Sequence, residues 1–268
     1  MRQMKLVRVL TIAGSDSCGG AGIQADLKTI TALGGFGMSV ITAVTAQNTS
    51  GVQGICEVPS AFVRKQFESV VTGIGVDAVK TGMLGSTETL KAVAGMLRKY
   101  KIKKVVVDPV MAAKGGKALI RGKAKEGLIA ELIPLAFVVT PNVPEAELLS
   151  GIKITSETEM KRAAEVIHNL GAKNVVIKGG HLRGAAIDIL FDGRRFHNFS
   201  SARINRKDVH GTGCIFSSAV ATLLARGKDV PAAVKGAKDC VTKAIITSHR
   251  AGPGYRLVAK LFPPFPAQ

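Results

Sequence analysis

The sequence predicts an α/β fold of three layers, in which a mostly parallel central sheet is covered by helices on both faces. Short apolar runs rich in β-branched residues alternate along the 268 residues with longer segments of helical period. The runs are apolar on both faces, which is typical of strands buried between two helical layers. No linker, repeat or low-complexity stretch divides the chain. We therefore expect a single domain over residues 1–268, in which residues 252–268 form an irregular tail.

The elements follow from this alternation. The predicted strands are Val7–Ala13, Met38–Ala46, Ala78–Thr81, Lys104–Val110, Phe137–Thr140, Asn174–Lys178, and a hairpin of Ile187–Asp192 and Arg195–Phe199 around Asp192-Gly193. The predicted helices are Ala21–Leu33, Ser60–Thr72, Thr87–Tyr100, Lys123–Leu132, Glu145–Leu149, Glu157–Asn169, Gly213–Ala225 and Pro231–His249. Ligands of open parallel sheets bind at the carboxyl ends of the strands. The loops that follow the strands are therefore where a site is expected.

The net charge of +18 indicates an anionic partner: nucleic acid, a membrane surface or a phosphorylated small molecule. Residues 101–268 hold most of the excess, with 27 basic and 13 acidic residues. Aromatic residues make up only 4% and Trp is absent, which leaves little material for base stacking and disfavours a nucleic-acid binder. A membrane surface and a phosphorylated small molecule remain, and most of the basic residues are expected to form a solvated surface.

The four cysteines, Cys18, Cys56, Cys214 and Cys240, lie far apart and form no C-x-x-C pair. This spacing indicates neither a disulfide scaffold nor a zinc site, so reduced thiols in a cytoplasmic protein are expected. The apolar stretch Leu6 to Ala13 is too short for a secretory signal or a membrane span.

Two glycine-rich or polar loops follow the first two strands. Residues 14–22, which contain four glycines, lead into the first helix, and such a loop lets a ligand approach the backbone closely. A tight turn explains this loop equally well, and Asp26 in that helix could be a solvated acid. Gln47 follows the second strand and offers donors and an acceptor that suit an aminopyrimidine or pyridine edge, although a simple turn is the commoner role of such a residue.

Acidic and amide side chains follow the next strands. Asp108 comes after one apolar run, and Asn142 and Glu145 come after another. Hard oxygen ligands of this kind suit Mg²⁺ beside a phosphate chain. Helix capping explains Asn142 and Glu145 equally well.

The two remaining loops carry phosphate-binding features. Lys178 leaves a strand into paired glycines, where an ammonium could meet a polyphosphate. The most specific loop is Asp208-Val209-His210-Gly211-Thr212-Gly213-Cys214, because its glycines open a helix and direct N–H groups and the helix dipole at one point, an anion hole. Cys214 at that helix N-terminus should have its thiolate favoured.

Taken together, these motifs resemble the hydroxymethylpyrimidine/phosphomethylpyrimidine kinases of thiamine biosynthesis, within the ribokinase superfamily. The resemblance covers nearly the whole chain. It rests on the ordered set Thr11–Asp16, Gly19–Lys28, Ala46–Thr49, Lys80–Leu84, Asp108–Met111, Thr140–Asn142 with Pro144–Ala146, Lys178–His181 and His210–Cys214.

The resemblance implies a ribokinase-like fold, a homodimer, and ATP with Mg²⁺. It places the pyrimidine against five residues, which are Gly14, Asp26, Gln47, Met83 and Val110. The nucleotide and its magnesium ion are expected at Asp108, Asn142, Glu145, Lys178, Thr212 and Lys238. Asp108 and Glu145 are the expected metal ligands within this set.

The reaction implied is ATP-dependent phosphorylation of 4-amino-5-hydroxymethyl-2-methylpyrimidine, and then of its monophosphate to the diphosphate. Sugar kinases of this fold resemble D-x-x-G-x-G-D, whereas a thiol, Cys214, stands here at the last position. We expect Cys214 to be the catalytic residue, either as a thiolate base helped by His210 or as part of the anion hole with Gly211 and Gly213. Lys178 is expected to assist transfer. Residues 112–119 are expected to form a mobile flap.

Three alternatives remain from the sequence. A pyridoxal or pyridoxine kinase is the nearest, and Gln47 argues for the aminopyrimidine instead. A basic nucleic-acid-binding module on a kinase-like scaffold is the second, although no helix-turn-helix, zinc or RNP signature is present. The third is a degenerate kinase that binds the pyrimidine without transferring phosphate, against which the intact set of Asp108, Glu145, Lys178 and the 211–214 loop argues.

Overall fold

A computed structural model describes residues 6–111, 124–180, 182, 185–206 and 208–258. Its strands lie in a nine-stranded sheet of order β3-β2-β1-β4-β5-β6-β7-β8-β9, with a separate pair, β10 and β11. They are β1 (Arg8–Asp16), β2 (Phe36–Asn48), β3 (Gly51–Glu57), β4 (Ala78–Thr81), β5 (Val105–Val107), β6 (Val138–Val139), β7 (Val175–Ile177), β8 (Ala186–Phe191), β9 (Phe196–Ser201), β10 (His249–Arg250) and β11 (Arg256–Leu257). The six strands that run through the middle of this order, β2-β1-β4-β5-β6-β7, pair in parallel. The outer strands β3, β8 and β9 pair antiparallel with their neighbours. The prediction of a mostly parallel sheet is confirmed.

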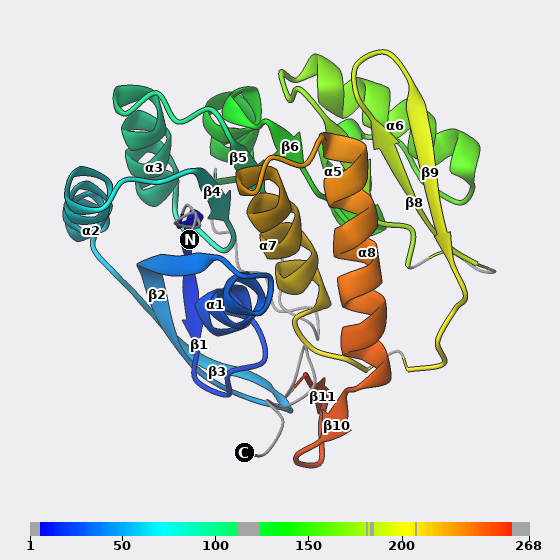
Figure 1. Ribbon diagram of the computed structural model, residues 1–268, viewed down its shortest axis with the longest axis horizontal. Helices are drawn as coiled ribbons and strands as arrows, with labels where there is room; N and C mark the ends of the chain where they lie inside the picture. The colour runs from blue at the N-terminus through cyan, green and yellow to red at the C-terminus, as the bar shows by residue number, and fades with distance from the viewer. Residues whose placement is uncertain (1–5, 112–123, 181, 183–184, 207, 259–268) are drawn as a thin grey trace, which may run out of the picture.

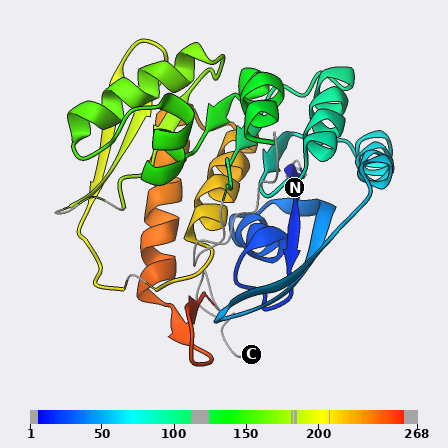
Figure 2. The same ribbon diagram turned by 180° about the vertical axis from the view of Figure 1, so that it is seen from behind.

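Helices cover both faces of this sheet (Figure 1). They are α1 (Gly22–Ala32), α2 (Ser60–Gly73), α3 (Thr87–Lys99), α4 (Ala124–Gly127), α5 (Val143–Ser150), α6 (Glu157–Asn169), α7 (Thr212–Ala225) and α8 (Val230–Ile246), with a π-helical turn (Leu128–Leu132) and a 3-10 turn (Ile133–Leu135) after α4. Helices α1, α7 and α8 lie on the face seen in front in Figure 1, and the view from behind shows the other helices (Figure 2). The predicted three layers are therefore present.

The core is divided by the sheet into two apolar layers. Strand β5 shows why, because Val105 and Val107 point into the layer beneath α2 to α6 while Val106 points into the layer beneath α1, α7 and α8. Successive side chains of a strand face opposite sides, so a strand buried on both faces is apolar throughout. This pattern is what the sequence predicted for the central strands.

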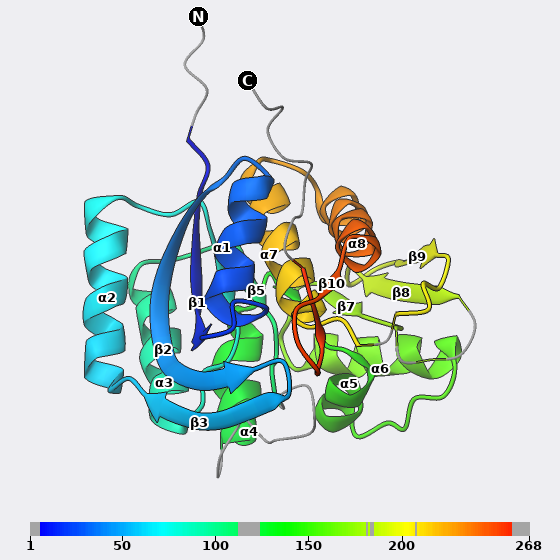
Figure 3. The same ribbon diagram turned by 90° about the horizontal axis from the view of Figure 1, so that it is seen from below.

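Two strand assignments differ from the prediction. The residues expected to turn after the second strand, including Gln47, continue β2 and pair antiparallel with β3, a strand that the sequence analysis missed. Strand β3 contains Gly51 and Gly54 and lies at the sheet edge, where few apolar contacts mark it. Figure 3 shows this hairpin projecting beside β1. The hairpin brings Gln47 to the carboxyl edge of the sheet.

The C-terminal segment also differs from the expected irregular tail. Arg256 and Leu257 form β11, which pairs with β10. The backbone N–H of Tyr255 donates to the carbonyl of Thr49, and that of His210 donates to the carbonyl of Arg256. The described part of the tail therefore joins the tip of the β2–β3 hairpin to the loop before α7.

Candidate active site

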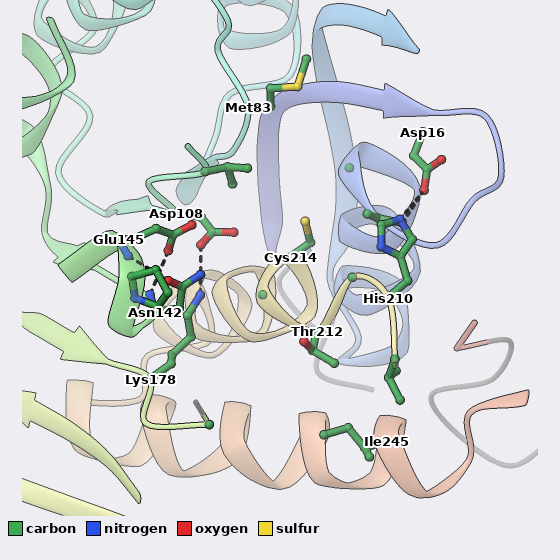
Figure 4. Close-up of a pocket in the computed structure, with 18 of the residues that line it drawn as sticks. Asp16, Met83, Asp108, Asn142, Glu145, Lys178, His210, Thr212, Cys214 and Ile245 are labelled. Carbon is green, nitrogen blue, oxygen red and sulfur yellow. Dashed lines mark hydrogen bonds and ion pairs between the residues drawn. The ribbon is translucent and has the colours of Figure 1, made fainter. Parts of the chain in front are cut away.

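A cavity of about 1120 Å³ opens at the carboxyl ends of the parallel strands. Pockets for a single small molecule are commonly about 300–1,000 Å³, so this cavity has room for more than one ligand. Its lining includes most of the residues expected from the sequence, as the close-up shows (Figure 4). They are Gly14, Gln47, Met83, Asp108, Val110, Asn142, Glu145, Lys178, His210, Gly211, Thr212, Gly213 and Cys214.

The anion loop, residues 208–214 leading into α7, requires glycine at Gly211 and brings Gly213 close to charged side chains. Gly211 has a left-handed backbone (φ +78°), and a Cβ there would lie 1.9 Å from the carbonyl oxygen of Gly20. A Cβ at Gly213 would lie 3.4 Å from Nζ of Lys178 and 3.8 Å from Oδ2 of Asp108. The first turn of α7 therefore faces the Lys178 ammonium, and N–H groups and a cation converge where an anion can bind.

Lys178 and two carboxylates form a charged cluster beside this loop. Lys178 Nζ lies 3.2 Å from Oδ1 of Asp108. Burial raises the pKa of Glu145 to about 7, and Asp108 adds to this rise while Lys178 opposes it. For Lys178, burial favours the neutral amine, but Asp108 and Glu145 outweigh it and raise its pKa. Two carboxylates compete here for one ammonium, so a further cation would be favourable.

Asn142 and Glu145 form a capping box at the start of α5. The backbone N–H of Glu145 donates to Oδ1 of Asn142 (2.9 Å), and the backbone N–H of Asn142 donates to Oε2 of Glu145 (2.8 Å). The capping role that the sequence left open is therefore present, and both residues also line the cavity. One helix start thus fixes a carboxylate at the edge of the site.

The expectation of a favoured thiolate at Cys214 is wrong. Burial raises the pKa of its thiol to about 12 and outweighs Lys80, which lowers it. Asp26 and Asp108 raise it further. The position at a helix N-terminus does not compensate for a desolvated site that also holds two carboxylates.

His210 does not assist Cys214, which corrects the expected thiolate and histidine pair. Its Nε2 lies 2.9 Å from Nε2 of Gln47 and 3.3 Å from Oδ2 of Asp16. The imidazole is 7% exposed and stacks on Tyr255 at 6.0 Å between ring centres. It therefore belongs to the Gln47 end of the cavity.

Asp26 is neither solvated nor part of the cavity lining. It is fully buried, and Lys80 Nζ donates to both of its oxygens at 3.0 and 2.8 Å. The hydroxyls of Thr11 and Ser218 also donate to it, at 2.5 and 2.6 Å. Its expected contact with a pyrimidine edge is corrected, because its hydrogen-bonding capacity is used inside the protein.

The expected nucleotide contact of Lys238 is also corrected. Its Nζ lies 2.9 Å from Oδ2 of Asp188, both side chains are 9% exposed, and Lys238 is absent from the cavity lining. The other oxygen of Asp188 accepts the backbone N–H of Gly179 at 3.0 Å. Lys238 is held in a buried ion pair that supports the turn after Lys178, so its expected nucleotide contact is replaced by a supporting one.

The sequence analysis missed two charged residues of the site. Lys80 lines the cavity floor and pairs with Asp26, and the signal for it was a lysine inside an otherwise apolar strand. Asp16 holds the first loop, since it accepts backbone N–H groups of Cys18, Gly20 and Ala21. The expected flap at residues 112–119 lies outside the described residues, as does His181.

Comparison with known proteins assigns the chain to a family. Residues 16–259 match the family model described as phosphomethylpyrimidine kinase. The chain belongs to the phosphomethylpyrimidine kinase family. Within it, the chain is 51% identical over 246 residues to the hydroxymethylpyrimidine/phosphomethylpyrimidine kinase of Streptomyces coelicolor, covering 92% of this chain and 91% of that one.

The chain is also similar to two other proteins. The chain is 56% identical over 248 residues to the thiamine biosynthesis bifunctional protein ThiED of Geobacter sulfurreducens, covering 92% of this chain and about half of that longer protein (51%). It also resembles the crystal structure of an ADP complex of Bacillus subtilis pyridoxal kinase, with a TM-score of 0.89 and 39% identity, covering 95% of this chain and 97% of the other. The ribokinase-like fold expected from the sequence is confirmed.

Proposed function

We infer that this chain is an ATP-dependent kinase of 4-amino-5-hydroxymethyl-2-methylpyrimidine and of its monophosphate, acting in thiamine biosynthesis. The observation that carries this inference is the arrangement of one cavity. Gly14, Gln47, Met83 and Val110 line the same cavity as Lys178 and the first turn of α7. Apolar and amide side chains suit a ring, and an ammonium with helix N–H groups suits a phosphate. Their presence in one cavity suits transfer of a phosphoryl group to a hydroxymethyl group on a ring.

The protein's part in this reaction is positioning and charge stabilisation. Phosphoryl transfer passes through a loose transition state with charge spread over the phosphoryl oxygens. The N–H groups of α7, from Thr212 onwards, and the Lys178 ammonium face that charge. In the second step a monophosphate meets ATP, and two polyanions in one cavity increase the need for such donors.

We propose that Cys214 acts as a neutral thiol within the anion hole rather than as a base. A thiol with a pKa near 12 holds its proton at neutral pH. Its position at the start of α7 allows the S–H to donate weakly to a phosphoryl oxygen. A strong base is not required in a loose transition state, because the hydroxyl proton can leave late.

We propose that Asp108 and Glu145 hold Mg²⁺. Oδ1 of Asp108 pairs with Lys178, and Glu145 accepts the backbone N–H groups of Asn142 and Met111. An ionised carboxylate has about four lone-pair sites, so both groups can still bind a cation. The raised pKa of Glu145 fits this role, since a cation would restore its charge. Hard carboxylate oxygens beside a phosphate site suit Mg²⁺, which supplies charge neutralisation when bound.

The test is a two-step assay with the purified protein, ATP and Mg²⁺, in which monophosphate and diphosphate are measured separately. We expect both products, and neither in an Asp108→Asn, Glu145→Gln double variant. The kinase function would be refuted if the wild-type protein released ADP no faster with the pyrimidine than without it. Monophosphate without diphosphate would refute the second step alone.

Pyridoxal is a second candidate substrate, favoured by the likeness to a pyridoxal kinase structure. The ratio of kcat/KM for the aminopyrimidine to that for pyridoxal decides between them. We expect the ratio to exceed one, because Gln47 can pair with an amino group beside a ring nitrogen. A ratio below one would reverse the order of the two substrates.

A homodimer remains an expectation from the family resemblance, and a cytoplasmic location remains one from the cysteine spacing. Sedimentation of the purified chain would test the dimer. Among residues 6–111, 124–180, 185–206 and 208–258, no helix is long and apolar enough to cross a membrane.

A further inference from the structure

Three polar side chains meet at the Gln47 end of the cavity, and together they form a chain of contacts. Nε2 of His210 lies between Oδ2 of Asp16, at 3.3 Å, and the side-chain amide of Gln47, at 2.9 Å. Asp16 is 3% exposed and His210 is 7% exposed, and Figure 4 shows the two side chains facing each other. Such a buried chain of contacts is stable only if each donor meets an acceptor.

The first question is which ring nitrogen of His210 carries the proton. Oδ2 of Asp16 accepts the backbone N–H groups of Gly20 and Ala21 at 3.0 and 2.8 Å. Burial would raise the pKa of this carboxyl, but hydrogen bonds from His210 and from Ala21 and Cys18 lower it to about 2. An ionised carboxylate needs a donor opposite it, so the proton belongs on Nε2.

The other ring nitrogen supports the same assignment. Nδ1 of His210 is buried and has no hydrogen-bond partner among the described residues. A buried N–H without a partner is rarer in proteins than a buried acceptor without one. A proton on Nε2 leaves Nδ1 as the bare acceptor, which is the less costly of the two arrangements.

The second question is which way the amide of Gln47 points. With its nitrogen towards His210, two N–H donors would face each other. On the other side, Oε1 of Gln47 lies 3.3 Å from Oγ1 of Thr45, whose single proton is already donated to the carbonyl of Ser15 at 2.9 Å. A half turn of the amide exchanges its nitrogen and oxygen with little change of shape. Oε1 then accepts from His210, and Nε2 donates to Thr45, so both conflicts disappear.

We propose that Asp16 and His210 are positioning residues that fix the direction of the Gln47 amide and thereby determine which ring the enzyme prefers. This proposal rests on the proposed kinase function. In the fixed direction, Gln47 keeps a lone pair on Oε1 and one N–H on Nε2 for a ligand. An amino group beside a ring nitrogen offers the matching donor and acceptor. A pyridoxal ring has no amino group next to its nitrogen and cannot make this pair of hydrogen bonds.

A metal ion is a poorer explanation of the same atoms. Ligand atoms of Asp16, Cys18 and His210 lie within 4.8 Å of one another. However, Oδ2 of Asp16 already accepts two backbone N–H groups, and Oδ1 accepts the N–H of Cys18 at 3.0 Å. A metal would have to displace these donors from the loop that they hold together. The hydrogen bonds of His210 with Asp16 and Gln47 require no such change.

The proton position can be tested on the unaltered protein. Nitrogen-15 NMR of histidine side chains reports which ring nitrogen is protonated, and the signals of His210 are those missing from the spectrum of His210→Gln. We expect a protonated Nε2 at neutral pH. A bare Nε2 would overturn the proposal, because it could then accept from the Gln47 amide and would repel Asp16. This result does not depend on whether the protein is a kinase.

The effect on preference is tested with two variants and two substrates. The substrates are the aminopyrimidine and an analogue with hydrogen in place of the amino group. In His210→Leu we expect the ratio of kcat/KM for the aminopyrimidine to kcat/KM for the analogue to fall about tenfold, mainly because KM for the aminopyrimidine rises. The variant loses the hydrogen bond that orients the Gln47 amide, and one hydrogen bond contributes about this factor of ten. His210→Gln keeps an N–H donor near the position of Nε2 and should recover most of the ratio.

Two outcomes of this experiment would overturn the proposal. One is a wild-type ratio in a folded His210→Leu protein. The other is a His210→Gln ratio as low as that of His210→Leu, because loss of shape rather than of a donor would then be responsible. Thermal unfolding of both variants shows whether they are folded, and if neither folds the NMR result decides. Absence of any turnover by the wild-type protein would instead refute the kinase function and leave the NMR result standing.

Discussion

Cys214 shows how strongly burial can change the chemistry of a single residue. A thiol at a helix N-terminus ordinarily loses its proton more easily, yet here desolvation and two nearby carboxylates have the larger effect. The sequence placed Cys214 correctly at the start of α7. It could not give the depth of the site or the carboxylates that come from α1 and the end of β5.

Replacing Cys214 tests the neutral-thiol role. We expect Cys214→Ala to lower kcat by about 10²-fold, the loss typical of removing one donor from an oxyanion site. Cys214→Ser keeps a hydroxyl donor and should retain activity within about tenfold of wild type. Steady-state kinetics from pH 6 to 9 should show no change attributable to a thiol titration, because the thiol form persists below about pH 12. Full activity in Cys214→Ala would show that the Cys214 thiol has no part in the reaction.

Asp16 should contribute stability that depends on pH. Its pKa is lowered from 3.8 to about 2, where burial opposes the change and hydrogen bonds from His210 and backbone N–H groups cause it. The carboxylate form is the bonded one, so its stabilisation is complete above about pH 4 and is lost as the pH falls towards 2. The shift corresponds to about 2 kcal/mol.

Urea unfolding of wild type and Asp16→Asn at several pH values measures this contribution. The difference between their unfolding free energies should grow from about pH 2 to pH 5 and then level off. The exposed Asp239, which pairs with Lys235 on α8, provides the control Asp239→Asn, for which we expect no such change. A constant difference for Asp16→Asn across the range would contradict the assignment.

At the scale of the elements, most helices begin and end within a few residues of the prediction because caps and periodicity are local. Ser156 and Glu159 cap α6 as a Ser-x-x-Glu pattern should. The β2–β3 hairpin was missed because its edge strand has little apolar contact. Buried charges that join elements were also missed, since pairing between residues 54 positions apart, such as Asp26 and Lys80, has no local signature.

The Asp26 and Lys80 pair joins α1 to β4, and Ser218 links it to α7 one turn beyond Cys214. We expect Lys80→Met to cost about 3–5 kcal/mol of unfolding free energy, because it leaves the Asp26 carboxylate buried without its counter-charge. The double variant Asp26→Leu, Lys80→Met removes both charges and should recover part of that loss. Urea unfolding of the double variant and of the single variants Asp26→Leu and Lys80→Met measures these losses. A double variant less stable by the sum of the two single losses would show that the pair is not coupled.

On the scale of the whole molecule, the +18 charge separates into a small functional part and a larger surface. Lys178 faces the anion loop and pairs with Asp108, while Lys80 and Lys238 pair with buried carboxylates outside the cavity lining. The remaining basic residues contribute a field that attracts anions from a distance. Such a field acts on association and is screened by salt.

Salt dependence separates this field from the contacts in the site. Raising the ionic strength from about 0.01 to 0.15 M shortens the screening length from about 30 to 8 Å. At subsaturating ATP, kcat/KM for ATP should fall severalfold over this range. KM for the neutral pyrimidine at saturating ATP is the internal control and should change little. Equal sensitivity of both would show that salt acts on folding or on the site itself.

By itself, the sequence determined the α/β class, the order of most elements, and the loops that supply Gln47, Asp108, Lys178 and residues 210–214. These features depend on local periodicity, turn chemistry and chain order, which the sequence contains directly. Only the tertiary structure decided which polar residues face the cavity and which face each other. In the folded chain Asp26 and Lys238 are buried in ion pairs, the pKa of Cys214 is raised, and His210 contacts Gln47. The sequence could not show these features because burial and electrostatic partners depend on residues distant in the chain.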